Sequence, residues 1–265
     1  MFSFKIKVIC GILNVTPDSF SDGGLYYKKE DAIRRADEII KEGASWIDIG
    51  GQSTRPYSEP ISVDEEIKRV IPVIYEVKSK YPSIIVSVDT YYPEVAIEAI
   101  KVGVDVINDI TGLRDEKMID VVLRYKKPVV IMHMKGKPKD MQINPVYDDV
   151  VLEIMNFFRE KIDFLKKNNF NDIILDPGIG FGKKLEHNVE IIKNMKKFRN
   201  LGYPIMFGPS RKSFIGMITG EKDPKKRLAG TIASCIFCYQ YVDIFRVHDV
   251  YEVKQAFDVF EYLLK

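Results

Sequence analysis

Cysteine, charge of one sign and long apolar runs are all scarce in this sequence, and each scarcity excludes a class of protein. Three cysteines in 265 residues do not make a disulfide framework, which favours a reducing compartment. Lysine and arginine (40) nearly balance aspartate and glutamate (38), so the net charge of +2 lacks the basic excess of a nucleic-acid binder. No apolar stretch approaches the roughly 18 residues that span a bilayer. We therefore expect a soluble, cytoplasmic protein that binds neither nucleic acid nor membrane.

Short β-branched runs alternate along the chain with amphipathic stretches. The runs are almost continuously apolar, which is typical of parallel strands covered on both faces. The predicted strands are 7–14, 45–50, 83–89, 105–110, 128–134, 172–176, 204–208 and 243–247. The predicted helices are 30–42, 64–80, 93–102, 116–126, 148–168, 186–200, 223–241 and 249–264. This alternation predicts an α/β fold, a (β/α)8 TIM barrel with 1–265 as a single domain, although an open doubly wound sheet would give a similar local pattern.

Polar side chains stand at nearly every predicted strand end. In a barrel the carboxyl ends of the strands meet at one face, where the loops that follow them form the site. The polar or turn-forming residues at these ends are Asn14, Asp48, Asp89, Asn108, Asp109, His133, Asp176, Gly208, Pro209, Arg246 and His248. The opposite ends of the strands carry only ordinary turn residues. The regular placement predicts a functional site at the carboxyl face.

Two groups of opposite character can be distinguished among these residues. Asp89, Asn108 and Asp176 can together recognise a flat heterocycle with paired N–H groups, since a carboxylate accepts two parallel hydrogen bonds. Each of the three, taken alone, is more readily explained as a helix N-cap. The segments GPSRKSFIG (208–216) and RVH (246–248) bring cations and backbone amides together, which suits a phosphorylated leaving group.

Seven segments of the chain resemble, in order, those of the dihydropteroate synthase family. They are NVTPDSFSDGG (14–24), DIGGQSTRP (48–56), SVDT (87–90), INDITG (107–112), DPGIGFGK (176–183), GPSRKSFIG (208–216) and RVHDV (246–250). The resemblance implies a (β/α)8 barrel and a transferase that joins 6-hydroxymethyl-7,8-dihydropterin diphosphate to p-aminobenzoate. Pyrophosphate would be released, with Mg²⁺ as cofactor. It also implies a homodimer, and competition by sulfonamides, which mimic p-aminobenzoate.

The same resemblance implies roles for individual residues. Asn14 would be a ligand of the magnesium diphosphate. The residues that would bind the pterin diphosphate are Thr54, Arg55, Asp89, Asn108, Asp176, Lys212, Arg246 and His248. Those that would form the p-aminobenzoate pocket are Thr54, Pro56, Phe181, Lys212 and Ser213. The catalytic set among them would be Asp89, Asp176, Lys212, Arg246 and His248.

Two positions depart from the family pattern. Gln52 stands where the family usually has Glu, and Tyr57 follows Pro56 where Gly is usual. Neither position belongs to the residues implied for the pterin or the diphosphate. We therefore expect these departures to bear on the affinity for p-aminobenzoate more than on the type of reaction.

Other functions could use the same fold. A related pterin-binding barrel presents methyltetrahydrofolate to a corrinoid protein; it would share the acidic and amide residues but would not need the cationic segments at 208–216 and 246–248. A non-catalytic barrel is a second alternative, against which the full set of polar strand ends argues. Cys235 and Cys238 lie within one predicted helix without a second metal-ligand pair, so we expect them to be buried core residues.

Overall fold

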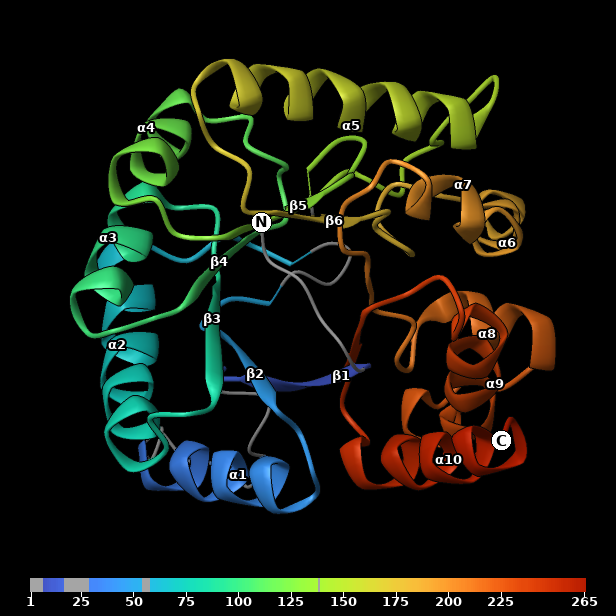
Figure 1. Cartoon of the computed structure of the whole chain (residues 1–265), viewed down its shortest axis with the longest axis horizontal. Helices are drawn as coiled ribbons and strands as arrows, with labels where there is room; N and C mark the ends of the chain where they lie inside the picture. The colour runs from blue at the N-terminus through green and yellow to red at the C-terminus, as the bar shows by residue number, and fades with distance from the viewer. Residues whose placement is uncertain (1–6, 17–28, 54–57, 138) are drawn as a thin grey trace.

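The strands form one closed parallel sheet, surrounded by a ring of helices (Figure 1). The computed structural model describes residues 7–16, 29–53, 58–137 and 139–265. The strands lie in the order β6-β5-β4-β3-β2-β1-β8-β7, and every pairing is parallel. A parallel bridge from Leu175 to Ile205 joins the two ends of this order. The predicted TIM barrel is therefore confirmed, and the open doubly wound sheet is excluded.

The strands and helices lie close to the predicted ranges. The strands are β1 (Val8–Asn14), β2 (Trp46–Gly50), β3 (Ile85–Asp89), β4 (Val106–Asp109), β5 (Val129–Met132), β6 (Ile173–Asp176), β7 (Met206–Phe207) and β8 (Ile244–Val247). The helices are α1 (Lys29–Lys41), α2 (Val63–Lys80), α3 (Pro93–Lys101), α4 (Glu116–Tyr125), α5 (Val150–Lys167), α6 (Leu185–Lys193), α7 (Met195–Arg199), α8 (Ser213–Thr219), α9 (Leu228–Cys238) and α10 (Val250–Leu263).

Three helical segments differ from the prediction. The stretch predicted as one helix over 186–200 is divided at Asn194 into α6 and α7. The stretch predicted over 223–241 begins with a 3₁₀ helix, Pro224–Lys226, before α9. Helix α8 lies in a segment expected to be a loop, because its seven residues are too few to show helical periodicity. It is held by burial of Phe214 and Ile215 and ends at Gly220, whose backbone is left-handed.

Two apolar layers support the barrel. A cluster inside it combines side chains from seven of the strands, namely Val8, Cys10, Trp46, Val106, Val130, Ile174, Met206 and Ile244. A larger cluster fills the space between strands and helices, and it includes Cys235 and Cys238. All three cysteines are buried and free, as expected. The inner layer closes the barrel below its carboxyl face, so polar residues that point inward at the strand ends stand on an apolar floor.

Candidate active site

The strand register brings several predicted site residues to one level. Asn14 pairs with Gly50, Gly50 with Asp89, and Asp89 with Asn108, so the ends of four neighbouring strands stand in a row. Asp176 is the last residue of β6 and pairs with Met132 at the end of β5. The alternation of strands and helices thus gathers, at the carboxyl face, residues that are far apart in the sequence.

Asp48 is the centre of a buried hydrogen-bond network at this face. Its Oδ2 accepts from Asn108 Nδ2 at 2.9 Å and from Arg246 Nε at 2.6 Å. Its Oδ1 accepts from the hydroxyl of Ser87, which in turn accepts from Trp46 Nε1 at 2.7 Å. From the sequence, Asp48 was predicted only as one of the polar strand ends, without a role of its own. The available signal was a carboxylate within an apolar strand, which has to find partners when it is buried.

Asp89 is joined to the same network but keeps one oxygen for another donor. Its Oδ2 accepts from Arg246 Nη2 at 2.8 Å. Burial raises the pKa of Asp89 to about 7; the charge of Arg246 opposes this rise and that of Asp48 adds to it. Its Oδ1 is buried and has no hydrogen-bond partner among the described residues. Leaving a buried carboxylate oxygen unpaired is costly, so this atom is a ready acceptor for a ligand N–H.

Asp176 and Lys212 are close enough for the charge of each to influence the pKa of the other. Asp176 Oδ1 accepts from the backbone N–H of Gly178 at 2.7 Å. Burial raises the pKa of Asp176, and the charge of Lys212 opposes that rise. Burial also lowers the pKa of Lys212 to about 8, against the opposing charge of Asp176. The Lys212 ammonium donates to the carbonyl of Ile179 and lies 4.3 Å from the centroid of the Phe181 ring.

His248 has a defined orientation at the end of β8. The backbone N–H of His248 donates to Ser210 Oγ at 3.1 Å, and the same oxygen lies 2.9 Å from His248 Nδ1. Because Ser210 Oγ accepts the amide hydrogen, its own hydroxyl hydrogen is available to Nδ1. When the hydroxyl donates to Nδ1, a neutral ring carries its proton on Nε2. An Nε2–H donor suits recognition of an anionic oxygen.

The cations of the segment 208–216 were predicted to face a phosphorylated leaving group, but the charge of Arg211 is neutralised by Asp249. Its Nε donates to Asp249 Oδ2 at 3.0 Å and its Nη2 donates to Asp249 Oδ1, a two-pronged ion pair. The backbone at Arg211 is left-handed, with φ of 60°, whereas the Lys212 ammonium donates to the carbonyl of Ile179. Of the two cations in the segment 208–216, Lys212 is therefore the one that contacts the other predicted site residues.

Two other predicted residues lie at the end of a strand and at the start of a helix. Asn14 is half-buried at the end of β1, and Ser213 is the exposed first residue of α8. Thr54, Arg55 and Pro56 lie outside the described residues. The structure therefore brings Asp89, Asn108 and Arg246 into one network, and Asp176, Lys212 and Phe181 into a second group.

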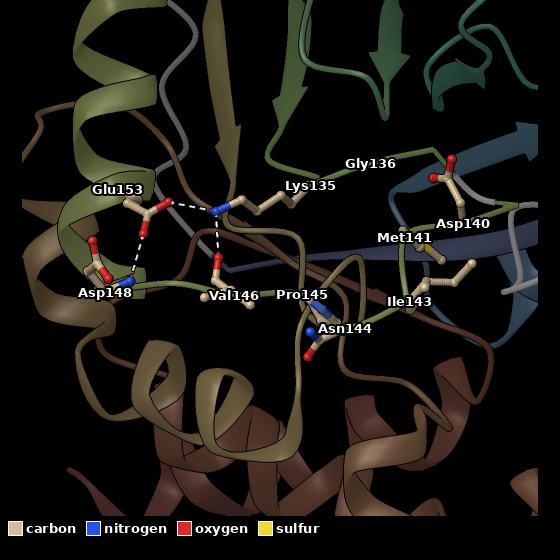
Figure 2. Close-up of a pocket in the computed structure, with 10 residues that line it drawn as sticks. All are labelled: Lys135, Gly136, Asp140, Met141, Ile143, Asn144, Pro145, Val146, Asp148 and Glu153. Carbon is tan, nitrogen blue, oxygen red and sulfur yellow. Dashed lines mark hydrogen bonds and ion pairs between the residues drawn. The ribbon is translucent and has the colours of Figure 1, made fainter.

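An open hollow of about 790 Å³ is lined by the connection between β5 and α5 and by the start of α5. Figure 2 shows the Lys135 side chain pointing to Val146 and Glu153; its ammonium donates to the Val146 carbonyl at 2.6 Å and to Glu153 Oε2 at 3.0 Å. Among the predicted site residues that the structure describes, none lines this hollow. It has no set of converging buried polar groups, which is what identifies a reaction site, so the strand ends remain the candidate.

Comparison with known proteins agrees with this geometry. Residues 10–248 match the family described as pterin binding enzyme. The dihydropteroate synthase of Escherichia coli (strain K12) is 42% identical over 256 residues, which are 96% of this chain and 90% of that protein. The chain belongs to the dihydropteroate synthase family. The motif resemblance is thereby confirmed.

Solved dihydropteroate synthases share the whole architecture. The Xanthomonas albilineans dihydropteroate synthase with 4-aminobenzoic acid is 39% identical with a TM-score of 0.92, covering 98% of this chain and 94% of that one. The Thermus thermophilus dihydropteroate synthase in complex with 6HMPPP is 37% identical with a TM-score of 0.84, covering 98% and 95%.

Gln52 is the departure from the dihydropteroate synthase pattern that the structure describes, since Tyr57 lies outside the described residues. Gln52 is buried; its Nε2 donates to the Tyr91 hydroxyl, and its Oε1 accepts from the backbone N–H of Ile61 at 3.2 Å. An amide can make both contacts, whereas a carboxylate has no hydrogen to donate to Tyr91. Gln52 thus links Ile61 to Tyr91, which follows β3.

Proposed function

We propose that this member of the dihydropteroate synthase family condenses 6-hydroxymethyl-7,8-dihydropterin diphosphate with p-aminobenzoate, giving 7,8-dihydropteroate and pyrophosphate in folate biosynthesis. The observation that carries the proposal is the buried network at the carboxyl face, in a chain that matches these enzymes over nearly its full length. Asp89 and Asn108 are buried there, and Arg246 is held beside them by Asp48 and Asp89. The network leaves acceptors for a heterocycle next to a cation for a diphosphate, and a barrel that carries methyltetrahydrofolate would not need that cation.

The pterin ring is proposed to bind to Asp89, Asn108 and Asp176, with Lys212 beside it. The unpartnered Oδ1 of Asp89 supplies an acceptor for a ring N–H. Asn108 is held by its Nδ2 donating to Asp48, so its side-chain oxygen keeps a fixed direction. A pterin presents an amidine-like N–H pair and a ring carbonyl, which match carboxylate acceptors and an amide or ammonium donor.

The diphosphate is proposed to bind to Arg246 and His248, together with Thr54 and Arg55. Arg246 directs two of its five N–H donors at the carboxylates of Asp48 and Asp89. The others can reach a phosphate oxygen without breaking this support. The Nε2–H of His248 supplies a further donor for the leaving group.

The proposed reaction separates charge and needs no strong base. The bond between the pterin methylene and the bridging oxygen breaks, and its electron pair leaves with pyrophosphate. The electron-rich pterin delocalises the resulting positive charge. The lone pair of the aryl amine then forms the new C–N bond, and the nitrogen loses a proton to water. Arg246 and His248 stabilise the negative charge on pyrophosphate, a preorganised effect of typically several kcal/mol.

Mg²⁺ is the proposed cofactor, with Asn14 as its protein ligand. No group of three or more histidine, cysteine, aspartate or glutamate side chains among the described residues is placed to hold a metal ion. Such a cage is not required, because Mg²⁺ usually keeps several waters and binds one or two protein oxygens together with substrate phosphates. The half-buried Asn14 amide at the end of β1 fits that role. When bound, the ion supplies charge neutralisation to the diphosphate.

The p-aminobenzoate pocket is proposed to be formed by Phe181, Lys212 and Ser213, together with Thr54 and Pro56. The Phe181 ring offers an apolar wall, and the ammonium of Lys212 stands over it. An aryl carboxylate can pack on such a ring while a cation and the first residue of a helix face its charge. Sulfonamides are expected to compete for this pocket.

A homodimer is proposed through the outer faces of the late helices. Phe237 on α9 is 62% exposed and Tyr262 on α10 is 76% exposed. Val253 and Phe257, which are also on α10, are buried and cannot contribute to such a surface. Sedimentation should show twice the monomer mass of 30.5 kDa, and a single 30.5 kDa species would reject the dimer.

We further propose that residues 1–265 act as one domain in the cytoplasm. The three buried, free cysteines support a reducing compartment. None of the described helices has the length and apolar character needed to cross a membrane.

The direct test of the proposed function is release of pyrophosphate from the pterin diphosphate. Release should require Mg²⁺ and should begin when p-aminobenzoate is added, with 7,8-dihydropteroate formed in equal amount. Binding of methyltetrahydrofolate without any such release would favour the corrinoid-linked alternative. If the protein shows no turnover and binds neither the pterin diphosphate nor methyltetrahydrofolate, a non-catalytic barrel is favoured.

Replacing Lys212 tests the site within that function. We expect Lys212→Ala to lower kcat/KM by more than about tenfold, since it removes a charge from beside Asp176 and Phe181. Because the pKa of Lys212 is lowered to about 8, the wild-type kcat/KM should fall as the pH rises through about 8. Lys212→Arg stays charged, so the fall of kcat/KM at high pH, the basic limb of the profile, should be absent in this variant. The exposed Lys222→Ala is the control, and wild-type rates from folded Lys212→Ala would reject the assignment.

A further inference from the structure

Lys183 is a buried lysine whose partners are carbonyl oxygens and an imidazole. It lies at the end of the segment 177–183, which follows β6, and is 3% exposed. Its Nζ donates to the carbonyls of Gly178, Phe181 and His133 at 2.9, 3.0 and 3.0 Å. It also lies 3.1 Å from His133 Nδ1. An ammonium has three hydrogens, so these carbonyls alone can satisfy it.

The segment that Lys183 crosses carries contacts to two proposed site residues. The N–H of Gly178 holds Asp176 Oδ1 at 2.7 Å. The carbonyl of Ile179 accepts from the Lys212 ammonium, and the Phe181 ring lies beneath it. The position of this segment therefore decides where the Asp176 carboxylate and the Lys212 ammonium stand relative to each other.

The segment is seated closely on the end of β5. Gly178 has φ of +71°, and a Cβ there would lie 1.9 Å from the His133 carbonyl oxygen. Outer contacts come from the connection whose hollow is drawn in Figure 2: Gln142 Nε2 donates to the Gly180 carbonyl at 2.6 Å, and the Tyr147 hydroxyl donates to that of Gly182 at 2.8 Å. Lys183 makes the inner contact, between the segment and β5.

The charge of Lys183 has no carboxylate partner at hydrogen-bond distance among the described residues. Burial, together with the nearby charge of Lys183, lowers the pKa of His133 to about 2, so this imidazole is neutral and can accept a hydrogen bond. Burying an ammonium is costly when an apolar side chain of similar volume would fill the space. What the buried Lys183 ammonium provides in return is a fixed position for the carbonyls to which it donates.

We propose that Lys183 is a positioning residue for binding of the pterin diphosphate. By tying the carbonyls of Gly178 and Phe181 to the end of β5, it fixes Asp176 and Lys212 in the arrangement that receives the pterin. The inference deepens the proposed function and rests on it. Lys183 itself contacts neither group that we place on the substrate, and it acts through the backbone of the segment.

The test replaces Lys183 with methionine, which keeps the length of the side chain and removes its hydrogen bonds. Lys184→Met is the matched control, since Lys184 is the next residue and is exposed. The measurements are melting temperature, the Kd for pterin diphosphate by calorimetry, and the pH profile of kcat/KM for enzyme whose active sites have been titrated. We expect the Kd to rise at least about tenfold in Lys183→Met and to stay within about twofold in Lys184→Met.

The pH profile separates positioning from a purely structural role. Loosening the segment should return Lys212 toward water and raise its pKa, so the basic limb near pH 8 should move to higher pH in Lys183→Met. A lower melting temperature with an unchanged Kd and an unchanged limb would overturn the proposal. If Lys183→Met does not fold, Lys183→Arg answers the same question, because it keeps the charge but cannot place three hydrogens of one nitrogen on three carbonyls.

Lys212→Ala distinguishes failure of this inference from failure of the proposed site. If Lys212→Ala binds pterin diphosphate as the wild type does, the site itself is wrong. If Lys212→Ala loses affinity while folded Lys183→Met and Lys183→Arg keep it, the site stands and the positioning role is overturned.

Discussion

Asp48→Asn is expected to lower kcat/KM on the order of 100-fold and the free energy of unfolding by about 3–5 kcal/mol. The Asp48 carboxylate is fully buried and accepts from Ser87, Asn108 and Arg246. An asparagine has nearly the same shape, but its NH₂ group would face groups that themselves donate. The Arg246 guanidinium would keep only Asp89 as a buried counter-ion.

The activity loss should arise without any contact between Asp48 and substrate. In the proposed site Asn108 holds the pterin and Arg246 holds the diphosphate, and Asp48 fixes both from below. Loss of this support should raise KM for the pterin diphosphate and lower kcat together, because both the ring and the leaving group are misplaced.

Denaturant unfolding and steady-state kinetics measure the two effects, with the exposed Asp120→Asn as the control. A double-mutant cycle that combines Asp48→Asn with Arg246→Met measures the coupling free energy between the two residues. Because Asp48 and Arg246 are in direct contact, the double variant should be less damaged than the sum of the single ones. Additive losses, or a wild-type kcat/KM in folded Asp48→Asn, would contradict the role of the network.

Most of the barrel could be predicted from the sequence because each strand–helix unit carries its own local signal. Apolar runs marked the strands, and the polar residue at each strand end marked the carboxyl face. Helix α8 lacked such a signal, since a seven-residue helix spans too few turns. The division at Asn194 between α6 and α7 was missed for the same reason.

The candidate site could be predicted only as a set of residues at strand ends. Which of them touch depends on strand register and on backbone conformation, which are long-range properties. Nothing in the residue types separates Arg211 from Lys212, yet a left-handed backbone at Arg211 leaves it paired with Asp249. The role of Lys183 could not be predicted, because it donates to backbone carbonyls and every residue has a carbonyl.

Asp176→Asn is expected to lower kcat/KM on the order of 1,000-fold while the enzyme becomes slightly more stable. The Asp176 carboxylate accepts one backbone N–H, from Gly178, and its other oxygen is proposed to accept from the pterin. An asparagine offers one acceptor oxygen where the Gly178 N–H and the ring N–H together require two, so affinity for the pterin diphosphate should be lost. The charge of Asp176 also supports that of Lys212, so the basic limb in the variant should move to a pH below about 8.

The gain in stability follows from the direction in which the pKa of Asp176 is shifted. Burial raises that pKa above its value in the unfolded chain, so the folded state favours the protonated form. Its favourable contribution is then fully present below the unfolded pKa, and it is lost as the pH rises through the folded pKa. The neutral amide of the variant would carry no such loss, so Asp176→Asn should exceed the wild type by about 1 kcal/mol at pH 8 and by less toward pH 4.

Urea unfolding at pH 4, 6 and 8 tests this, with the exposed Asp163→Asn as the control. Equal stability differences at every pH would mean that the carboxylate is not desolvated. Lower stability at pH 8 would mean that its pairing with Lys212 outweighs its burial. A variant that loses activity while it gains stability indicates a residue retained for ligand binding. In the free enzyme the buried Asp176 carboxylate lowers the stability of the fold. Hydrogen bonding to the bound pterin would offset this loss.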